Sequence, residues 1–162
     1  MLFTGHYEHV IDEKNRLAIP ATIRNQMEPE RDGKRLYLLP SGQPGVLRLY
    51  PETYFRRLSD RLEQALVHDE DLLALEQAMF PLAELLEMDS AGRVGIPPEH
   101  LRLAKMEREV TVAGVRDHLE IVNRALFRFR MEEHLQNYAE IHRKAREAMF
   151  RNQNRTGHST GD

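Results

Sequence analysis

The chain contains no cysteine, which excludes disulfides, thiolate zinc sites and cysteine nucleophiles. This absence is consistent with a reducing, cytosolic location. No apolar run approaches the roughly 20 residues that a membrane-spanning helix requires. The first six residues also lack the basic start and apolar stretch of a signal peptide. We therefore expect neither a membrane protein, nor a secreted disulfide-stabilised protein, nor a thiol enzyme.

The 162 residues, of which 41% are apolar and 30% charged, suit one folded domain or two very small ones. The formal net charge is −3, but the charges are unevenly distributed. Residues 58–89 have a local balance of −8, which leaves +5 for the rest of the chain. Nucleic-acid binding depends on bases that converge on one face, so the negative net charge does not exclude it.

An internal repeat organises the chain. Residues 11–20 read IDEKNRLAIP and residues 88–97 read MDSAGRVGIP, so Asp, Arg, Ile and Pro recur at an offset of 77. A second match follows at an offset of 72, where LRLYP at 47–51 corresponds to LEIVN at 119–123. Two matches in the same order predict a tandem duplication of a unit of roughly 50 residues, with a spacer between the copies.

Each copy has the pattern of a strand, a tight turn and a returning strand. Alternating residues over 7–11 predict a strand with one buried face. The Asp that follows can accept backbone N–H bonds across the turn, as in an Asx-turn. Asn15 in the first copy matches Gly92 in the second, and these two residue types best tolerate positive φ. Short helices at 21–27 and 98–104 and strands at 36–39, 46–50, 110–113 and 119–122 are predicted to complete the two units.

Apolar residues spaced three and four apart predict helices in the spacer and after the second copy. Two helices are expected between Pro51 and Pro81. The stripe from Phe127 to Met149 predicts one helix of about 20 residues, from near 125 to 150. Each unit is too small to close a core alone, so we expect the two hairpins to pair in a small barrel or paired sheet with helices on its rim.

The motifs Asp12-x-x-x-Arg16 and Asp89-x-x-x-Arg93, each followed by an apolar-x-Ile-Pro tail, resemble the MraZ family of bacterial transcriptional regulators. The Gly5-His6-Tyr7 opening, the Leu-Tyr-Pro-x-x-x-Phe element at 49–55 and the length also match, so the resemblance covers about 1–150. One Asp-x-x-x-Arg motif occurs readily by chance, whereas two copies in the same setting are specific. Asn15 stands where Gly is more usual in the family.

The resemblance implies an α+β fold. It implies tandem duplicated AbrB-like (swapped-hairpin) β units forming a pseudo-twofold barrel, with peripheral helices and a long C-terminal helix. We accordingly expect the following segments: a first AbrB-like unit at 5–53, an acidic helical spacer at 54–81, a second AbrB-like unit at 82–125, a C-terminal helix at 126–150 and a disordered tail at 151–162.

The resemblance also implies sequence-specific binding to a promoter with short G-rich direct repeats, upstream of a cell-division and cell-wall gene cluster. It implies ring-shaped homo-oligomers and a cytoplasmic, nucleoid-associated location. The expected partners are therefore double-stranded DNA and further copies of the chain. No cofactor, membrane or small-molecule substrate is expected.

Four basic residues are candidate DNA contacts: Lys14, Arg16, Arg24 and Arg93. The guanidinium fork of Arg16 or Arg93 suits bidentate contact with guanine, worth about 1–3 kcal/mol of discrimination. Either arginine could equally serve its own turn through an ion pair with the preceding Asp. Lys14 has Ala91 as its counterpart, which favours heavier DNA contact by the first unit.

The remaining candidates are weaker or structural. Arg24 could contact a phosphate, although a solvated surface arginine is the commoner role. Structural roles in the turns are expected for Asp12, Asn15, Asp89 and Gly92.

No catalytic or metal site is expected, and the chain is not predicted to be an enzyme. His6 and His9 would point to opposite faces of a strand, and residues 68–71 read as a solvated acidic loop lacking the spaced ligands of a calcium site. The alternative function is an AbrB-like antitoxin that binds and neutralises a toxin, although the 12-residue polar tail is poor in apolar anchors.

Overall fold

The computed structural model describes residues 2–28, 30, 33–65 and 69–156. The chain forms two compact units, Met1–Arg124 and Ala125–Asp162, which are considered separately. The first unit contains all the strands found in the described residues and is an α+β structure built on an antiparallel sheet. The second contains the C-terminal helices.

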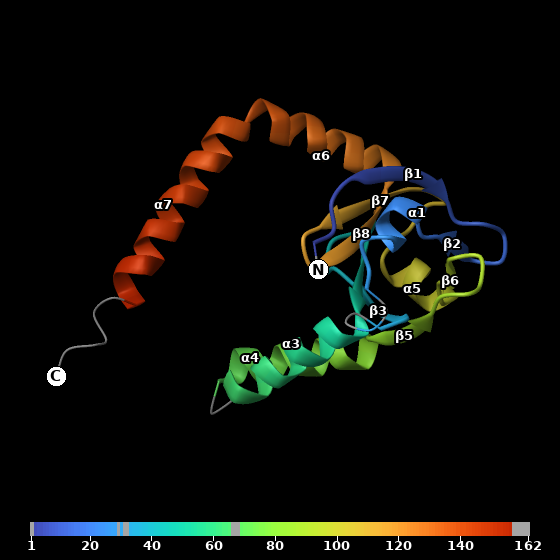
Figure 1. Cartoon of the computed structure of the whole chain (residues 1–162), viewed down its shortest axis with the longest axis horizontal. Helices are drawn as coiled ribbons and strands as arrows, with labels where there is room; N and C mark the ends of the chain where they lie inside the picture. Colours follow the sequence, from blue (N-terminus) through green and yellow to red (C-terminus); the bar gives the residue numbers. More distant parts are fainter. Residues whose placement is uncertain (1, 29, 31–32, 66–68, 157–162) are drawn as a thin grey trace. The chain divides into compact units, whose positions relative to one another are not determined.

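The two halves of the first unit follow the same order of elements, namely two strands, a short helix and two further strands (Figure 1). The first half contains β1 (His6–Val10), β2 (Arg16–Ala18), α1 (Ala21–Arg24), β3 (Arg35–Pro40) and β4 (Val46–Pro51). The second half contains β5 (Glu84–Glu87), β6 (Arg93–Gly95), α5 (Pro98–Leu103), β7 (Glu109–Val115) and β8 (His118–Asn123). The spacer contains α3 (Glu52–Ala65), α4 (Glu70–Met79) and a 3-10 turn, η1 (Phe80–Leu82).

The strands pair across the two halves. The large sheet has the order β1-β7-β8-β4-β3-β5, and β2 pairs with β6 in a separate two-stranded ribbon. The equivalent strands of the two halves are β1 and β5, β3 and β7, and β4 and β8. Exchanging each strand for its equivalent gives the same order read from the opposite end. The first strand of each half therefore pairs with a strand of the other half: β1 pairs with β7, and β5 pairs with β3.

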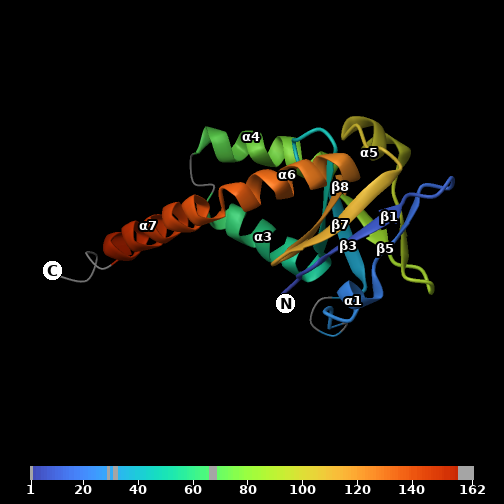
Figure 2. The same cartoon turned by 90° about the horizontal axis from the view of Figure 1, so that it is seen from above.

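The sheet is open, so the expected closed barrel is wrong. Its edge strands, β1 and β5, do not pair with each other in the part of the chain that the structure describes. The physical reason is that the chain turns back after each edge strand into β2 or β6. These two short strands then pair with each other instead of extending the large sheet (Figure 1). Figure 2 shows β1 and β7 of the large sheet from a second direction.

The core lies between the sheet and the ribbon and draws on both halves. Leu17 of β2 and Val94 of β6 face each other in register, and neither is exposed to solvent. They belong to one buried apolar cluster with Leu38, Leu49 and residues of β7 and β8. Since the cluster is continuous across the halves, neither half closes a core alone.

The helices differ from the sequence predictions at their ends. α1 and α5 are shorter than the predicted 21–27 and 98–104. The predicted acidic loop at 68–71 is wrong at 70–71, which begin α4, because Asp69 caps this helix by accepting hydrogen bonds from the backbone N–H groups of Asp71 and Leu72 at 2.9 and 3.2 Å. His68 lies outside the described residues.

The spacer also contributes to the core, since Phe55 of α3 is buried and stacks on Tyr37, with ring centroids 4.4 Å apart.

The C-terminal segment forms two helices, α6 (Arg124–Gln136) and α7 (Tyr138–Thr156), instead of the single predicted helix. The interruption falls at Asn137, whose side-chain amide donates to the carbonyl of Glu133 at 3.0 Å. The backbone N–H of Asn137 donates to the same carbonyl at 3.1 Å, and a side chain that shares the acceptor of its own backbone in this way bends helices. Residues 151–156 of the expected disordered tail belong to α7, and residues 157–162 lie outside the described residues. No described helix is long and apolar enough to span a membrane.

An ion pair sits where the two halves meet in the large sheet. Arg48 of β4 lies directly opposite Glu120 of β8, and the Nε and Oε1 atoms are 3.1 Å apart. These positions are equivalent in the repeat, at the offset of 72. Two copies of the same half paired in this register would place like charges opposite each other. The pair therefore favours pairing between unlike halves.

We expect Arg48→Glu and Glu120→Arg each to lower the free energy of unfolding by about 1–2 kcal/mol, because each replaces a cross-strand attraction by repulsion. The double exchange should recover most of the loss. Urea denaturation of the three variants measures this. A double variant that loses the sum of the two single effects would show that the charges are not coupled.

Candidate nucleic-acid interface

The turn between β1 and β2 is built around one carboxylate. Asp12 Oδ1 accepts hydrogen bonds from the backbone N–H groups of Lys14 and Arg16, both at 2.9 Å. Its Oδ2 accepts from the Nε of Arg16 at 2.8 Å. The same carboxylate therefore closes the turn and fixes the direction of the arginine side chain.

The turn between β5 and β6 repeats this geometry. Asp89 Oδ1 accepts from the backbone N–H groups of Ala91 and Arg93 at 2.9 Å, and Oδ2 accepts from Arg93 Nε at 2.9 Å. The backbone N–H donors in particular, helped by the arginines, hold the pKa values of the Asp12 and Asp89 carboxyls below their ordinary value. Both carboxylates are thus ionised at neutral pH.

Each turn is also tied to the other half of the protein. Asn15 and Gly92 have φ values of 59° and 75°, in the left-handed region that these residue types tolerate. The carbonyl of Asn15 accepts from the backbone N–H of Ile96 at 2.8 Å, and that of Gly92 accepts from Ile19 at 2.9 Å. The position of each turn consequently depends on the return strand of the opposite half.

The two arginines lie on the same outward face of the β2–β6 ribbon. Arg16 is opposite Gly95, and Arg93 is opposite Ala18, so the two arginines are diagonal neighbours. Leu17 and Val94, which directly follow Arg16 and Arg93 in the sequence, point into the core. The positions facing the arginines hold small residues, and a Cβ at Gly95 would meet no atom within 4 Å. Few side-chain atoms therefore surround the two guanidinium groups on this face of the ribbon.

The outer edges of both guanidinium groups are available to a ligand. About a third of each side chain is exposed, 35% for Arg16 and 36% for Arg93. Only the Nε atoms take part in the turns, and Nη1 and Nη2 make no hydrogen bond within the described residues. Each arginine thus makes one hydrogen bond within its turn through Nε and keeps Nη1 and Nη2 available to a ligand. Stabilising the turn and contacting DNA are therefore compatible roles.

The other two predicted DNA contacts fall at different turns. Lys14 is exposed at the tip of the first turn, beside Arg16. Arg24, although it follows β2, reaches the second turn: its Nε donates to the carbonyl of Ile19 at 3.1 Å, and its guanidinium lies against Gly92. The structure therefore brings Lys14 together with Arg16, and Arg24 close to the turn that carries Arg93.

Two cations near the turns were missed by the sequence reasoning. Arg108, before β7, donates from Nη1 to the carbonyl of Asp12 at 2.8 Å and to Asn15 Oδ1 at 2.7 Å. Lys34, before β3, lines a cavity beside Asp89. The strand registers make positions 34 and 108 equivalent in the two halves. Aligning the segments before β3 and β7 could have found both, because each carries a base at this position.

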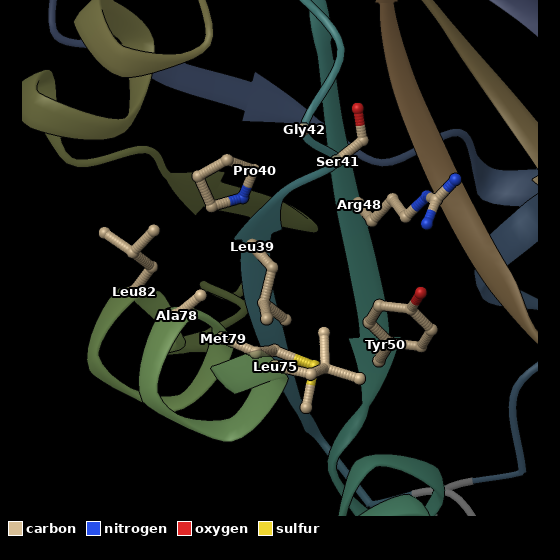
Figure 3. A pocket seen from close by; sticks show the side chains of 10 residues that line it. All are labelled: Leu39, Pro40, Ser41, Gly42, Arg48, Tyr50, Leu75, Ala78, Met79 and Leu82. Atoms are coloured by element: carbon tan, nitrogen blue, oxygen red, sulfur yellow. The ribbon is translucent and has the colours of Figure 1, made fainter. Parts of the chain in front are cut away.

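Other features of the described residues give no competing site. No group of three or more His, Cys, Asp or Glu side chains among them could hold a metal ion. A cavity of about 300 Å³ between α4 and strands β3 and β4 is lined mainly by apolar side chains, including Leu39, Leu75 and Met79 (Figure 3). The charged side chain in its lining, Arg48, is the one paired with Glu120.

Asp12→Asn should keep an acceptor for the turn but lose the ion pair, whereas Asp12→Ala should lose both. We expect the melting temperature at pH 7 to fall in the order wild type, Asn variant, Ala variant. A carboxyl whose pKa is depressed by folding stabilises above its unfolded pKa, and this stabilisation disappears as the pH falls through the folded pKa. The gap between wild type and the Asn variant should therefore narrow below about pH 3.8, the ordinary Asp pKa. A gap that stays constant in melting curves from pH 7 to pH 3 would contradict a role for the charge.

Comparison with known proteins covers both turns. The model of the family described as "MraZ protein, putative antitoxin-like" matches residues 2–75 and 79–153. The chain is 34% identical over 120 residues to the transcriptional regulator MraZ of Thermomicrobium roseum, across 74% of this chain and 80% of that protein. It is 31% identical over 141 residues to the transcriptional regulator MraZ of Pediococcus pentosaceus, across 86% of this chain and 94% of that protein. The resemblance carried by the two Asp-x-x-x-Arg motifs is thus confirmed, and the chain belongs to the MraZ family.

Proposed function

We propose that this protein is a sequence-specific DNA-binding transcriptional regulator, and that it contacts DNA through the outward face of the β2–β6 ribbon and its two turns. The observation that carries the proposal is the placement of Arg16 and Arg93. Both lie on one open face, each is held at Nε by its own turn, and each presents its Nη donors outward. The names of the two relatives, both transcriptional regulators, support the same function.

The chemistry of this face suits the major groove. A two-stranded β-ribbon fits the major groove of B-DNA, and an arginine fork pairs with O6 and N7 of guanine. Because the Asp carboxylates already restrict both arginines, little side-chain freedom remains to be lost on binding. Two arginines about 7–8 Å apart at Cα, as diagonal neighbours are, could contact adjacent bases of a G-rich site.

The finer parts of the proposal follow the family resemblance. They comprise a promoter with short G-rich direct repeats, upstream of a cell-division and cell-wall gene cluster, and a cytoplasmic, nucleoid-associated location. They also comprise the origin of the fold as two AbrB-like units that exchange hairpins. The exchange of β1 and β5 between the halves supports that origin.

An antitoxin function is the alternative, and the description of the family as antitoxin-like favours keeping it. The two functions differ in their partners. A regulator shifts its own upstream DNA in a gel without any other protein, whereas an antitoxin co-purifies with a toxin. Pull-down from the native host alongside the gel shift distinguishes them.

Arg16→Ala should weaken binding to the protein's own upstream DNA by about 1–3 kcal/mol, the value of a lost bidentate base contact. Arg93→Ala should act in the same direction but more mildly, since no lysine neighbours it in its turn. Arg16→Lys should keep the charge but lose specificity, because a lysine lacks the planar fork. Gel shifts on specific and scrambled DNA measure this, with Arg57→Ala in α3 as the matched control. Equal binding of both DNAs by the wild-type protein would overturn sequence-specific recognition.

We further expect a homo-oligomer larger than a dimer, consistent with the ring proposed from the resemblance. A single ribbon offers few DNA contacts, and several linked copies raise the effective concentration. Apolar side chains are available for assembly on α6 and α7, where Phe129, Leu135 and Phe150 are 58%, 68% and 66% exposed. Light scattering should report the assembly, and a monomer at micromolar concentration would contradict it.

A further inference from the structure

A cavity of about 330 Å³, lined by both polar and apolar residues, lies beside the second turn. It is lined by Asp89 and Gly92 of that turn and by Arg24, Asn25 and Lys34 from the first half. Two cations from one half therefore stand next to the turn of the other. The second turn itself has Ala91 where the first has Lys14, so its own sequence provides only Arg93.

The position of Arg24 in this cavity depends on the absence of a side chain at residue 92. A Cβ built on Gly92 would lie 2.5 Å from Cζ of Arg24 and 2.6 Å from its Nε, much too close for any real contact. The guanidinium thus occupies the space that a side chain would take, and its Nε is anchored on the Ile19 carbonyl.

The repeat explains why the two turns differ at this residue. The counterpart of Gly92 is Asn15, and the counterpart of Arg24 is Leu101. In the first turn the Asn15 side chain accepts a hydrogen bond from Arg108. Positive φ alone would allow Asn in either turn. A side chain in the second turn would displace the guanidinium of Arg24, and Gly leaves that space to it.

Among the described residues that line the cavity, two cations outnumber the one carboxylate, Asp89. That carboxylate already accepts two backbone N–H groups and the Nε of Arg93, so its charge is compensated within the turn. Arg24 and Lys34 are not paired with an acid in the described part of the chain. The cavity therefore has two cations and the Asn25 amide, a set suited to an anion with several oxygens.

We infer that this cavity binds one backbone phosphate of the DNA, next to the bases contacted by Arg93; this inference rests on the proposed function. Arg24 and Lys34 neutralise the phosphate and set the register of the ribbon, while Arg93 reads the base. The cations that the second turn lacks in its own sequence are supplied by the first half. Both turns then combine an arginine on the ribbon with further cations beside it.

The salt dependence of DNA affinity tests the inference. For B-DNA, the slope of log binding constant against log salt is about −0.9 per neutralised phosphate. Arg24→Gln and Lys34→Gln should each make the slope shallower. The double variant should change the slope by about 0.9 in total, because both residues neutralise the same phosphate. The loss should be equal on specific and scrambled DNA. Arg57→Gln, which removes an exposed cation of α3, should leave the slope unchanged.

Gly92→Asn provides an independent variant, because it installs the residue that the first turn holds at a similar positive φ, 59° at Asn15 against 75° at Gly92. Its Cβ should displace Arg24 at a modest cost in backbone strain, since Asn tolerates positive φ better than other non-glycine residues, so its salt slope should match that of Arg24→Gln. Melting curves show whether each variant is folded. Because Lys34 is exposed, Lys34→Gln still tests the site if Arg24→Gln fails to fold. Wild-type slopes in folded Arg24→Gln and Lys34→Gln would overturn the phosphate site while leaving the proposed function intact. Failure of the wild-type protein to bind DNA at low salt would overturn the proposed function itself.

Discussion

The bond between an aspartate carboxylate and the backbone of its own turn is the constraint on which the rest of this structure depends. In each half, one carboxylate accepts two backbone N–H groups and one arginine Nε. Because the turn is closed in this way, the following strand starts in the register that buries Leu17 or Val94. The same bond directs the arginine outward. A negative charge beside the proposed DNA-binding surface would normally repel phosphate, but the hydrogen-bond donors of the turn already compensate it.

Duplication within one chain permits the halves to differ, which a dimer of identical subunits could not do. The differences fall at positions where the halves meet. Arg48 faces Glu120 in the large sheet, and Asn15 accepts from Arg108 where Gly92 accommodates Arg24. Each of these pairs unites a residue from one half with a residue from the other. The divergence therefore makes the two halves dependent on each other.

Local features could be predicted from the sequence, whereas contacts between the halves could not. The Asp-x-x-x-Arg spacing and the matched Asn15 and Gly92 indicated the turns, because these are properties of a few adjacent residues. The open sheet was missed because no local pattern specifies that β2 pairs with β6 instead of extending β1. The cross-half roles of Arg24 and Arg108 depend on that same pairing. The interruption at Asn137 was missed because the apolar spacing continues across it, while its side-chain bond to Glu133 is invisible to periodicity.

The inequality of the two turns has a consequence for how the proposed regulator would lie on DNA. Proteins with strict twofold symmetry match sites with inverted symmetry, since each half-site meets the same surface. Here one turn carries Lys14 with an Asn15–Arg108 contact, and the other carries Arg24 and Lys34 with a bare Gly92. Reversing the ribbon on the DNA would exchange these unlike surfaces, so the two orientations would differ in free energy. A chain of this kind has a polarity, and copies aligned side by side in the same direction would suit repeats that all run the same way.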